Sequence, residues 1–147
     1  MTLGRQAERG NAMIEFALSF GLLFAVFSGV FQFGYALYVY NALESAVRAG
    51  VRYASLRTYD SATATPSSAY LTGVRNVVVY GNPAGGGQSV ARGLTPAHVT
   101  LTVTFDHNVP ALVAVGITNY TISAVVRSFT LTNKPNAAFP YMGRFAP

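Results

Sequence analysis

The sequence predicts an α+β protein in which a long N-terminal helix, with a membrane-spanning half and an amphipathic half, packs on a small antiparallel β-sheet domain. Three observations predict this fold class. About half of the 147 residues are hydrophobic, and no charged residue lies between Glu15 and Glu44. After Glu44 the pattern stays helical but becomes amphipathic, and from about residue 70 it changes to short strand-like segments separated by turn residues. A chain of this length accommodates one domain and one membrane segment.

The first element is apolar on every face. From Phe16 to Tyr40 only Ser19, Ser28 and Gln32 interrupt the hydrophobic run. This run exceeds the roughly 20 residues that a helix needs to cross a bilayer. It also exceeds the apolar core of a cleavable secretory signal, which is about 7–15 residues long. We therefore predict a transmembrane helix over about residues 16–38.

The same helix is expected to continue beyond the membrane. Leu43, Val47, Gly50/Val51 and Ala54 recur at helical spacing, with charged residues on the opposite face. Glu44 and Arg48 stand four residues apart in the order that favours a helix. The first proline is Pro66, so one uninterrupted helix from about Ala12 to about Arg57, within a segment 11–58, is predicted.

The remainder predicts a small antiparallel β domain over residues 59–132. A loop from Tyr59 to Ala69 precedes three predicted strands, with the glycine-rich loop "GNPAGGGQ" after the first and a proline loop, "NVPALVAVG", after the second. The strands are Val74–Tyr80, Val99–Phe105 and Tyr120–Leu131. A change of phase near Val125–Val126 suggests a bulge in the third. Residues 133–147, which contain three prolines, read as an irregular C-terminal extension.

Glu15 is the residue that the apolar pattern does not explain. A charge inside a spanning segment costs at least a few kcal/mol, so it needs a partner or a function. One interpretation is a carboxylate at the helix start, in the headgroup region, stabilised by the helix dipole. The other is a carboxylate that pairs with a charge on another molecule.

Two stretches around Glu15 carry a family resemblance: "RGNAMIEFAL" and "GVFQFGYALYVYNALESAVRAGVRYAS". A basic leader ends in Arg9-Gly10, and Glu15 follows five residues after that glycine. This arrangement resembles type IV pilin-like proteins and, more narrowly, the TadE-like pseudopilins of tight-adherence (Tad/Flp) pilus systems. The likeness covers about the first 55 residues.

The resemblance implies a function as well as a fold. It implies that a prepilin peptidase cleaves after Gly10, removes the leader 1–10 and makes Asn11 the new N-terminus. It further implies a subunit held in the bacterial inner membrane and then assembled, by pilus assembly machinery that includes an ATPase, into an extracellular filament for adhesion. Its partners would be copies of itself or other pilins. The Asn11 ammonium and a neighbouring subunit's Glu15 would then pair, since both charges are costly alone in a bilayer.

An alternative stays open: an uncleaved, single-pass inner-membrane scaffold with a periplasmic β domain. Arg48, Arg52 and Arg57 after the span outnumber Arg5 and Arg9 before it, which is opposite to the usual positive-inside bias. The resemblance implies a cytoplasmic leader and an exported C-terminal domain.

Seven aromatic residues follow a 4-4-3-4-4-3 spacing and so form one stripe along the apolar helix. They are Phe16, Phe20, Phe24, Phe27, Phe31, Tyr35 and Tyr38. Aromatic stripes at helical spacing are usually packing surfaces, and ring pairs add about 1 kcal/mol each. We favour this interpretation over a relay of rings for electron transfer.

The composition argues against catalysis. The chain has no cysteine, which excludes disulfides and thiol chemistry, and no catalytic residue grouping or phosphate loop can be assembled. Asp106-His107-Asn108 and His98 are better explained as polar residues at strand ends before the loop at Pro110 than as metal ligands. We expect no enzyme activity, cofactor or metal. Lys and Arg do not cluster in runs, so nucleic-acid or surface binding through Arg48, Arg52, Arg75 and Arg92 is the weakest hypothesis.

Overall fold

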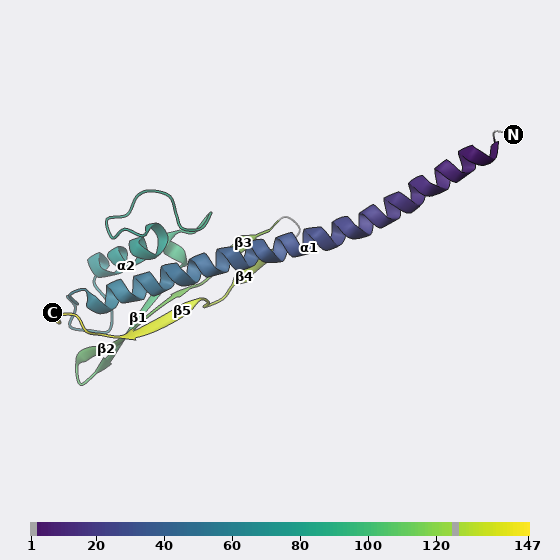
Figure 1. Cartoon of the computed structure of the whole chain (residues 1–147). Helices are drawn as coiled ribbons and strands as arrows, with labels where there is room; N and C mark the ends of the chain where they lie inside the picture. Colours follow the sequence, from purple (N-terminus) through teal and green to yellow (C-terminus); the bar gives the residue numbers. More distant parts are fainter. Residues whose placement is uncertain (1–2, 125–126) are drawn as a thin grey trace.

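The computed structural model describes residues 3–124 and 127–147 and has one long helix projecting from a small α+β domain (Figure 1). The first helix, α1 (Leu3–Leu56), is followed by α2 (Ser68–Tyr80) and a short 3-10 turn, η1 (Pro96–His98). Five strands follow: β1 (Val99–Asp106), β2 (Val109–Ile117), β3 (Tyr120–Ser123), β4 (Ser128–Leu131) and β5 (Asn136–Pro140). The predicted fold class, a long apolar N-terminal helix packed on a small antiparallel sheet, is confirmed.

The strands form two antiparallel sheets. One has the order β1-β2-β5, and the other is the β3–β4 pair. In β1, Val99 and Val103 are buried while Thr100, Thr102 and Thr104 are exposed, so the predicted alternation is confirmed. Both α1 and α2 contact the larger sheet, α1 through β2 and β5 and α2 through β1.

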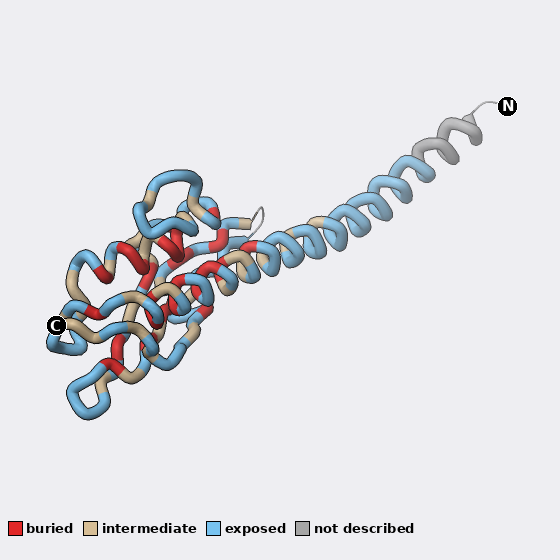
Figure 2. Tube along the Cα trace, turned by 60° about the vertical axis from the view of Figure 1, so that its left-hand side comes forward, coloured by how far each residue is buried: buried red, intermediate tan, exposed pale blue. Residues whose placement is uncertain are grey.

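The core lies between the distal half of α1, α2 and the sheet (Figure 2). The predicted apolar face of the distal half is confirmed, because Leu43, Val47, Val51 and Ala54 are almost fully buried. Helix α1 begins at Leu3, earlier than the expected start near Ala12, and ends at Leu56, close to the expected end.

The prediction of a strand at Val74–Tyr80 is wrong, because this segment is the second half of α2. Ser67 caps the helix by accepting a hydrogen bond from the Tyr70 amide at 3.1 Å. Gly81 ends it in the left-handed conformation, donating its N–H to the Val77 carbonyl. The buried valines of the segment also fit helical spacing, and packing against α1 outweighs their β propensity.

The prediction of a single third strand over Tyr120–Leu131 is also wrong. This segment is the hairpin β3–β4, in which the Thr121 and Thr130 hydroxyls lie 3.0 Å apart. The expected bulge at Val125–Val126 falls outside the described residues.

Two segments predicted to be irregular pair with the sheet. The proline loop is strand β2, in which Pro110 pairs with Phe105 next to a register shift in β1. Proline is tolerated there because β5 pairs only with Leu112–Gly116, so no third strand needs its missing N–H. The tail 133–147 contains β5, which completes the larger sheet.

Candidate functional site: the exposed half of α1

The half of α1 that extends beyond the domain exposes nearly all of its apolar side chains (Figure 2). Phe16, Phe27 and Tyr38 are 67%, 73% and 73% exposed. Soluble monomers rarely leave so continuous an apolar surface uncovered, so this surface indicates contact with a membrane or with other chains. By length and composition, the helix from Asn11 to Leu56 is long and apolar enough to cross a membrane.

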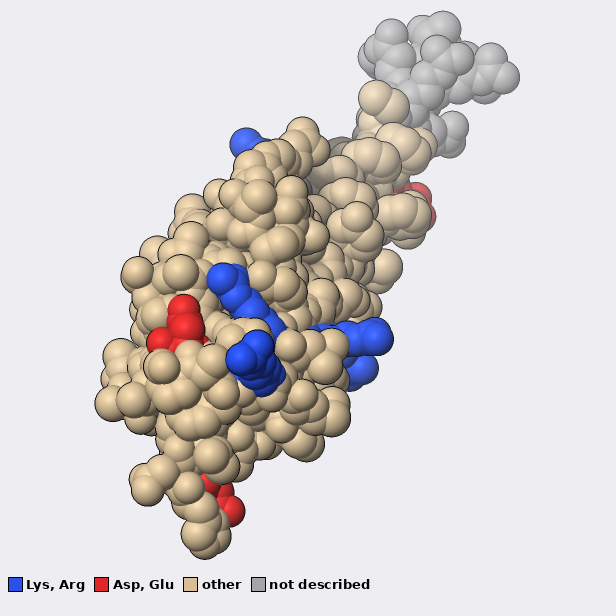
Figure 3. Space-filling view, turned by 90° about the vertical axis from the view of Figure 1, so that its left-hand side faces the viewer, with Lys and Arg blue, Asp and Glu red and all other residues tan. Residues whose placement is uncertain are grey.

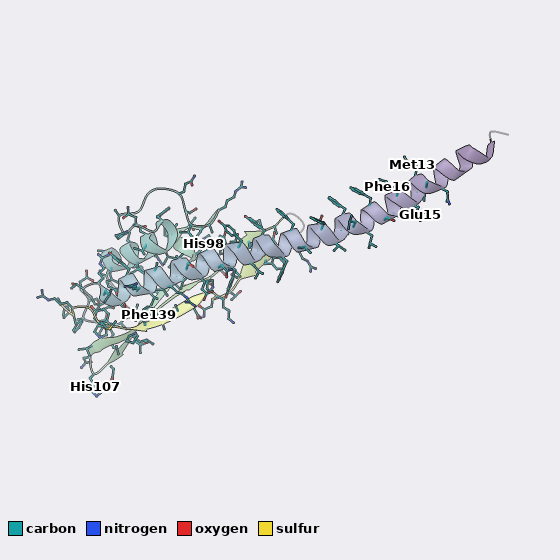
Figure 4. All side chains as sticks on the ribbon, in the orientation of Figure 1. Met13, Glu15, Phe16, His98, His107 and Phe139 are labelled. Atoms are coloured by element: carbon teal, nitrogen blue, oxygen red, sulfur yellow. The ribbon has the colours of Figure 1, made fainter. Side chains whose placement is uncertain are left out.

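Glu15 lies near the free end of this surface, beside Met13 and Phe16 and far from the domain (Figure 4). It is exposed. Within residues 11–124 and 127–147, the carboxylate has no ion pair or hydrogen bond. Over those residues the chain therefore supplies no cation or hydrogen-bond donor to this carboxylate. Such a group is suited to pairing with a charge on another molecule.

The predicted cleavage position lies within regular helix. Both Gly10 and Asn11 belong to α1, and the Asn11 side chain is exposed. Glycine has the weakest helix propensity of the ordinary residues apart from proline, about 1 kcal/mol below alanine.

The aromatic stripe forms the side of the exposed half, and its first rings touch. Phe16 and Phe20 have ring centroids 6.0 Å apart, and Phe20 and Phe24 are 6.2 Å apart, both in stacked geometry. All seven rings of the predicted stripe are exposed, from 38% at Tyr35 to 73% at Phe27 and Tyr38. The stripe thus packs on little within its own chain.

Glycines in the exposed half of α1 have open space around them, whereas Gly50 in the distal half is closely packed. A Cβ added at Gly21, Gly29 or Gly34 would meet nothing within 4 Å, whereas one added at Gly50 would come 2.3 Å from a methyl carbon of Val78. Packing within the chain therefore requires a glycine at position 50 but not at the other three. Small residues on an exposed apolar helix permit the close approach of a second helix.

The end of the domain furthest from the N-terminus is tied together by Tyr59, which sequence reasoning placed in a loop. Its buried ring contacts those of Tyr70, Phe105 and Tyr141 at 5.1–6.2 Å. Its hydroxyl donates to the Thr63 carbonyl at 2.7 Å. Burial raises the pKa of the Tyr59 and Tyr70 hydroxyls, because the phenolate loses its hydration.

Two clefts were not predicted. The larger one, of about 960 Å³, lies beside the distal end of α1 and is lined by Arg48, Arg52, Leu56, Phe139 and Met142 among others. Figure 3 views the molecule from this end and shows several basic side chains gathered on it. Arg48 in this cleft donates to Glu44 at 2.6 Å, which confirms the predicted helix pair.

The second cleft, of about 590 Å³, lies where the domain first meets the exposed half of α1. It is lined by Tyr35 and Val39 of α1, Arg92 and His98 of the loop and turn after α2, and β3 with the residue before it. We call it the hairpin cleft. Its residues are far apart in sequence, which is why no local motif indicated it.

The remaining sequence candidates are not brought together. Asp106 and His107 pair at 2.8 Å at the exposed β1–β2 turn, where His107 and Asn108 adopt positive φ. Across the part of the chain that the structure describes, no three residues of metal-ligating type gather. The four arginines of the surface-binding hypothesis also separate, because Arg75 donates to the Val99 carbonyl and Arg92 lines a different cleft from Arg48 and Arg52.

These features define a class of protein: a small α+β domain carried on a single long helix whose exposed half is apolar enough to cross a membrane. A family model described as TadE-like protein matches residues 10–52, which run from Gly10 to the buried face of α1. The match confirms the TadE-like resemblance over that segment and indicates a pilin-like, Tad pilus-associated protein. That family is structural rather than enzymatic. No curated protein and no solved structure matches the chain.

Proposed function

We propose that this chain is a structural subunit of a Tad-type pilus that is cleaved after Gly10 and assembled through the exposed half of α1. The observation that carries the proposal is the division of one continuous helix into a half buried by its own domain and a half that is exposed. Fully burying a large apolar side chain is worth about 1.5–3 kcal/mol. Leaving the stripe of seven aromatic rings in water would therefore be costly, so once the subunit leaves the membrane its helix is expected to be buried in a helical bundle.

Before assembly the same surface would lie in the inner membrane. Among the described residues, the hydrogen bond between α1 and the domain that lies furthest toward the N-terminus is made by Gln32, whose side-chain amide donates to the Arg127 carbonyl at 3.3 Å. Residues 11–31, which precede this contact, span roughly 31 Å at 1.5 Å per residue. That length matches a hydrocarbon core of about 30 Å. The polar domain would then begin at the headgroups near Gln32, so this proposed span begins and ends several residues earlier than the segment 16–38 expected from the sequence.

Glu15 acts in this proposal as a charge that sets register. It lies within a turn and a half of the new terminus, at Asn11, and would accept hydrogen bonds from the ammonium of a neighbouring subunit. A carboxylate near the middle of a bundle costs at least a few kcal/mol when alone. Only registers that bring the two charges together avoid that cost, so the pair selects one axial offset between subunits.

The first test is the intact mass and N-terminal sequence of the protein recovered from its native cells. A chain that begins at Asn11 supports prepilin processing. A chain that still begins at Met1 contradicts it and favours the alternative, an uncleaved inner-membrane scaffold with a periplasmic domain.

The second test compares Glu15→Gln and Glu15→Ala with the parent. Both variants should insert in the membrane as well as the parent, yet filament yield should fall at least tenfold because the ammonium has no counter-charge. Asp106→Asn, which removes a carboxylate at the exposed β1–β2 turn, is the matched control. Normal filaments from both Glu15 variants would contradict the register role while leaving cleavage to be judged by the mass.

A further inference from the structure

The hairpin cleft contains hydrogen-bond donors that have no partner among the residues that the structure describes. His98 accepts the Thr95 backbone N–H at Nδ1, at 3.1 Å. In the neutral ring the proton therefore lies on Nε2, which makes no hydrogen bond among the described residues. The same holds for the guanidinium of Arg92, which is exposed, and for the side chains of Asn119 and Ser123.

No carboxylate is found among the described residues that line the hairpin cleft. Its walls thus offer an arginine, a histidine N–H, an amide and a hydroxyl around a space of about 590 Å³. Donors gathered without an acidic residue select an anion with several oxygen atoms, and a guanidinium binds phosphate oxygens in pairs. The chemistry of the cleft is that of a phosphate group.

The cleft also lies at one defined height along α1. Tyr35 and Val39 form one of its walls, one turn or two beyond Gln32, where the domain first meets the helix. Tyr35, Tyr38 and Tyr40 gather on the same stretch, and tyrosines concentrate at the interface between hydrocarbon and water. A cleft at this height opens at the depth of lipid headgroups.

We propose that the hairpin cleft binds the phosphate of an anionic phospholipid headgroup while the protein is in the membrane. The Arg92 guanidinium would hold the phosphate oxygens, and the His98 Nε2–H and the Ser123 hydroxyl would donate further hydrogen bonds to them. The bound lipid fixes how far the domain stands from the bilayer. This inference rests on the membrane insertion included in the proposed function and is independent of cleavage and of filament formation.

The two histidines of the chain provide the measurement. His98 lies in the cleft beside α1, whereas His107 lies at the far tip of the β1–β2 turn (Figure 4). The full chain, labelled at histidine, would be placed in phosphatidylcholine nanodiscs with and without phosphatidylglycerol and followed by NMR. We expect phosphatidylglycerol to shift the His98 Nε2 and Cε1 resonances and to leave those of His107 in place.

Arg92→Gln tests the site itself, with Arg144→Gln at the opposite end as the control that removes the same charge. The Arg92 side chain is exposed, and Tyr120 bonds only its backbone carbonyl, at 2.9 Å, so the substitution leaves the fold unaffected. Apparent affinity for phosphatidylglycerol should fall about tenfold or more in Arg92→Gln and stay at the parent value in Arg144→Gln.

Three outcomes would overturn the proposal. The first is a silent His98 in a chain that inserts normally, and the second is an Arg92→Gln variant that responds like the parent. The third is an equal His98 shift from inorganic phosphate added to phosphatidylcholine discs, since the ligand would then be a free anion. Failure of the chain to enter any nanodisc would instead contradict membrane insertion, and with it both proposals.

Discussion

Gly50→Ala is expected to destabilise the domain, although alanine is the better helix former. At this position α1 and α2 approach so closely that a Cβ would lie 2.3 Å from a Val78 methyl carbon, while 3.4 Å is the lower end of ordinary contact. Val78 is itself fully buried, and a valine in a helix has one strongly preferred rotamer, so the methyl group has no free space to turn into. The two helices must separate instead.

The magnitude follows from two opposing terms. Replacing a mid-helix glycine by alanine gains about 1 kcal/mol in helix propensity. Overpacking a tight core by one methyl group costs about 1–3 kcal/mol. The net expectation is a loss of about 1 kcal/mol, which lowers the Tm of a domain this small by roughly 4–8 °C.

A double-mutant cycle separates the two terms. In a Val78→Ala background the obstructing methyl groups are absent, so Gly50→Ala should stabilise the domain by the propensity gain of about 1 kcal/mol. Unfolding of the full chain in detergent can be followed by near-UV circular dichroism of its 9 tyrosines, without tryptophan signal. A Gly50→Ala variant more stable than the parent, or an equal effect in both backgrounds, would refute the close packing of α1 on α2.

Three further predictions concern stability and assembly. Tyr70→Phe should cost about 1 kcal/mol at neutral pH, because the Tyr70 hydroxyl donates to the Ala54 carbonyl in the core. Burial raises the pKa of Tyr70 above its ordinary value of 10.0, so its contribution is complete below pH 10 and is lost as pH rises further. Unfolding at high pH should show a slope of up to about 1.4 kcal/mol per pH unit from this group, which the Tyr70→Phe variant lacks. Glu44→Gln should change stability by less than about 0.5 kcal/mol in denaturant titrations, because its pair with Arg48 is exposed. Phe24→Ala should leave the domain's Tm unchanged, since this ring is 63% exposed in the single chain, and reduce filament yield or length in electron micrographs.

An element could be predicted from the sequence when its own residues determine it, and could not when contacts with distant segments determine it. Helix α1 is decided by its own sequence: an apolar run without proline, then an amphipathic run whose Leu43, Val47 and Val51 face inward. Strand β1 is similarly decided by the alternation of valine and leucine with threonine. Both patterns are long and periodic, so packing against neighbouring elements stabilises the same secondary structure that the local sequence favours.

The errors occurred where short segments depend on distant partners. The valines of α2 fit a strand as well as a helix, and only the cap at Ser67 and the surface of α1 decide between them. Strand β5 has no apolar periodicity of its own and forms because β2 presents a free edge. The hairpin cleft is assembled from α1, the turn at His98 and β3, so its chemistry could be recognised only after the fold had brought them together.

The two halves of α1 are expected to have different roles: the distal half stabilises the domain, and the exposed half binds a membrane or other chains. Core residues of the distal half, such as Val47 and Val51, are buried by the domain, so their substitution changes the free energy of unfolding. Glu15 and the aromatic stripe are exposed, so their substitution leaves that free energy unchanged and alters only what the chain binds. Gln32 and Tyr35 lie at the boundary, where the domain rests against the helix and the hairpin cleft opens. If a lipid phosphate occupies that cleft in the membrane, extraction of the subunit must first release it, and the boundary becomes the point at which membrane anchoring is exchanged for contact with other subunits.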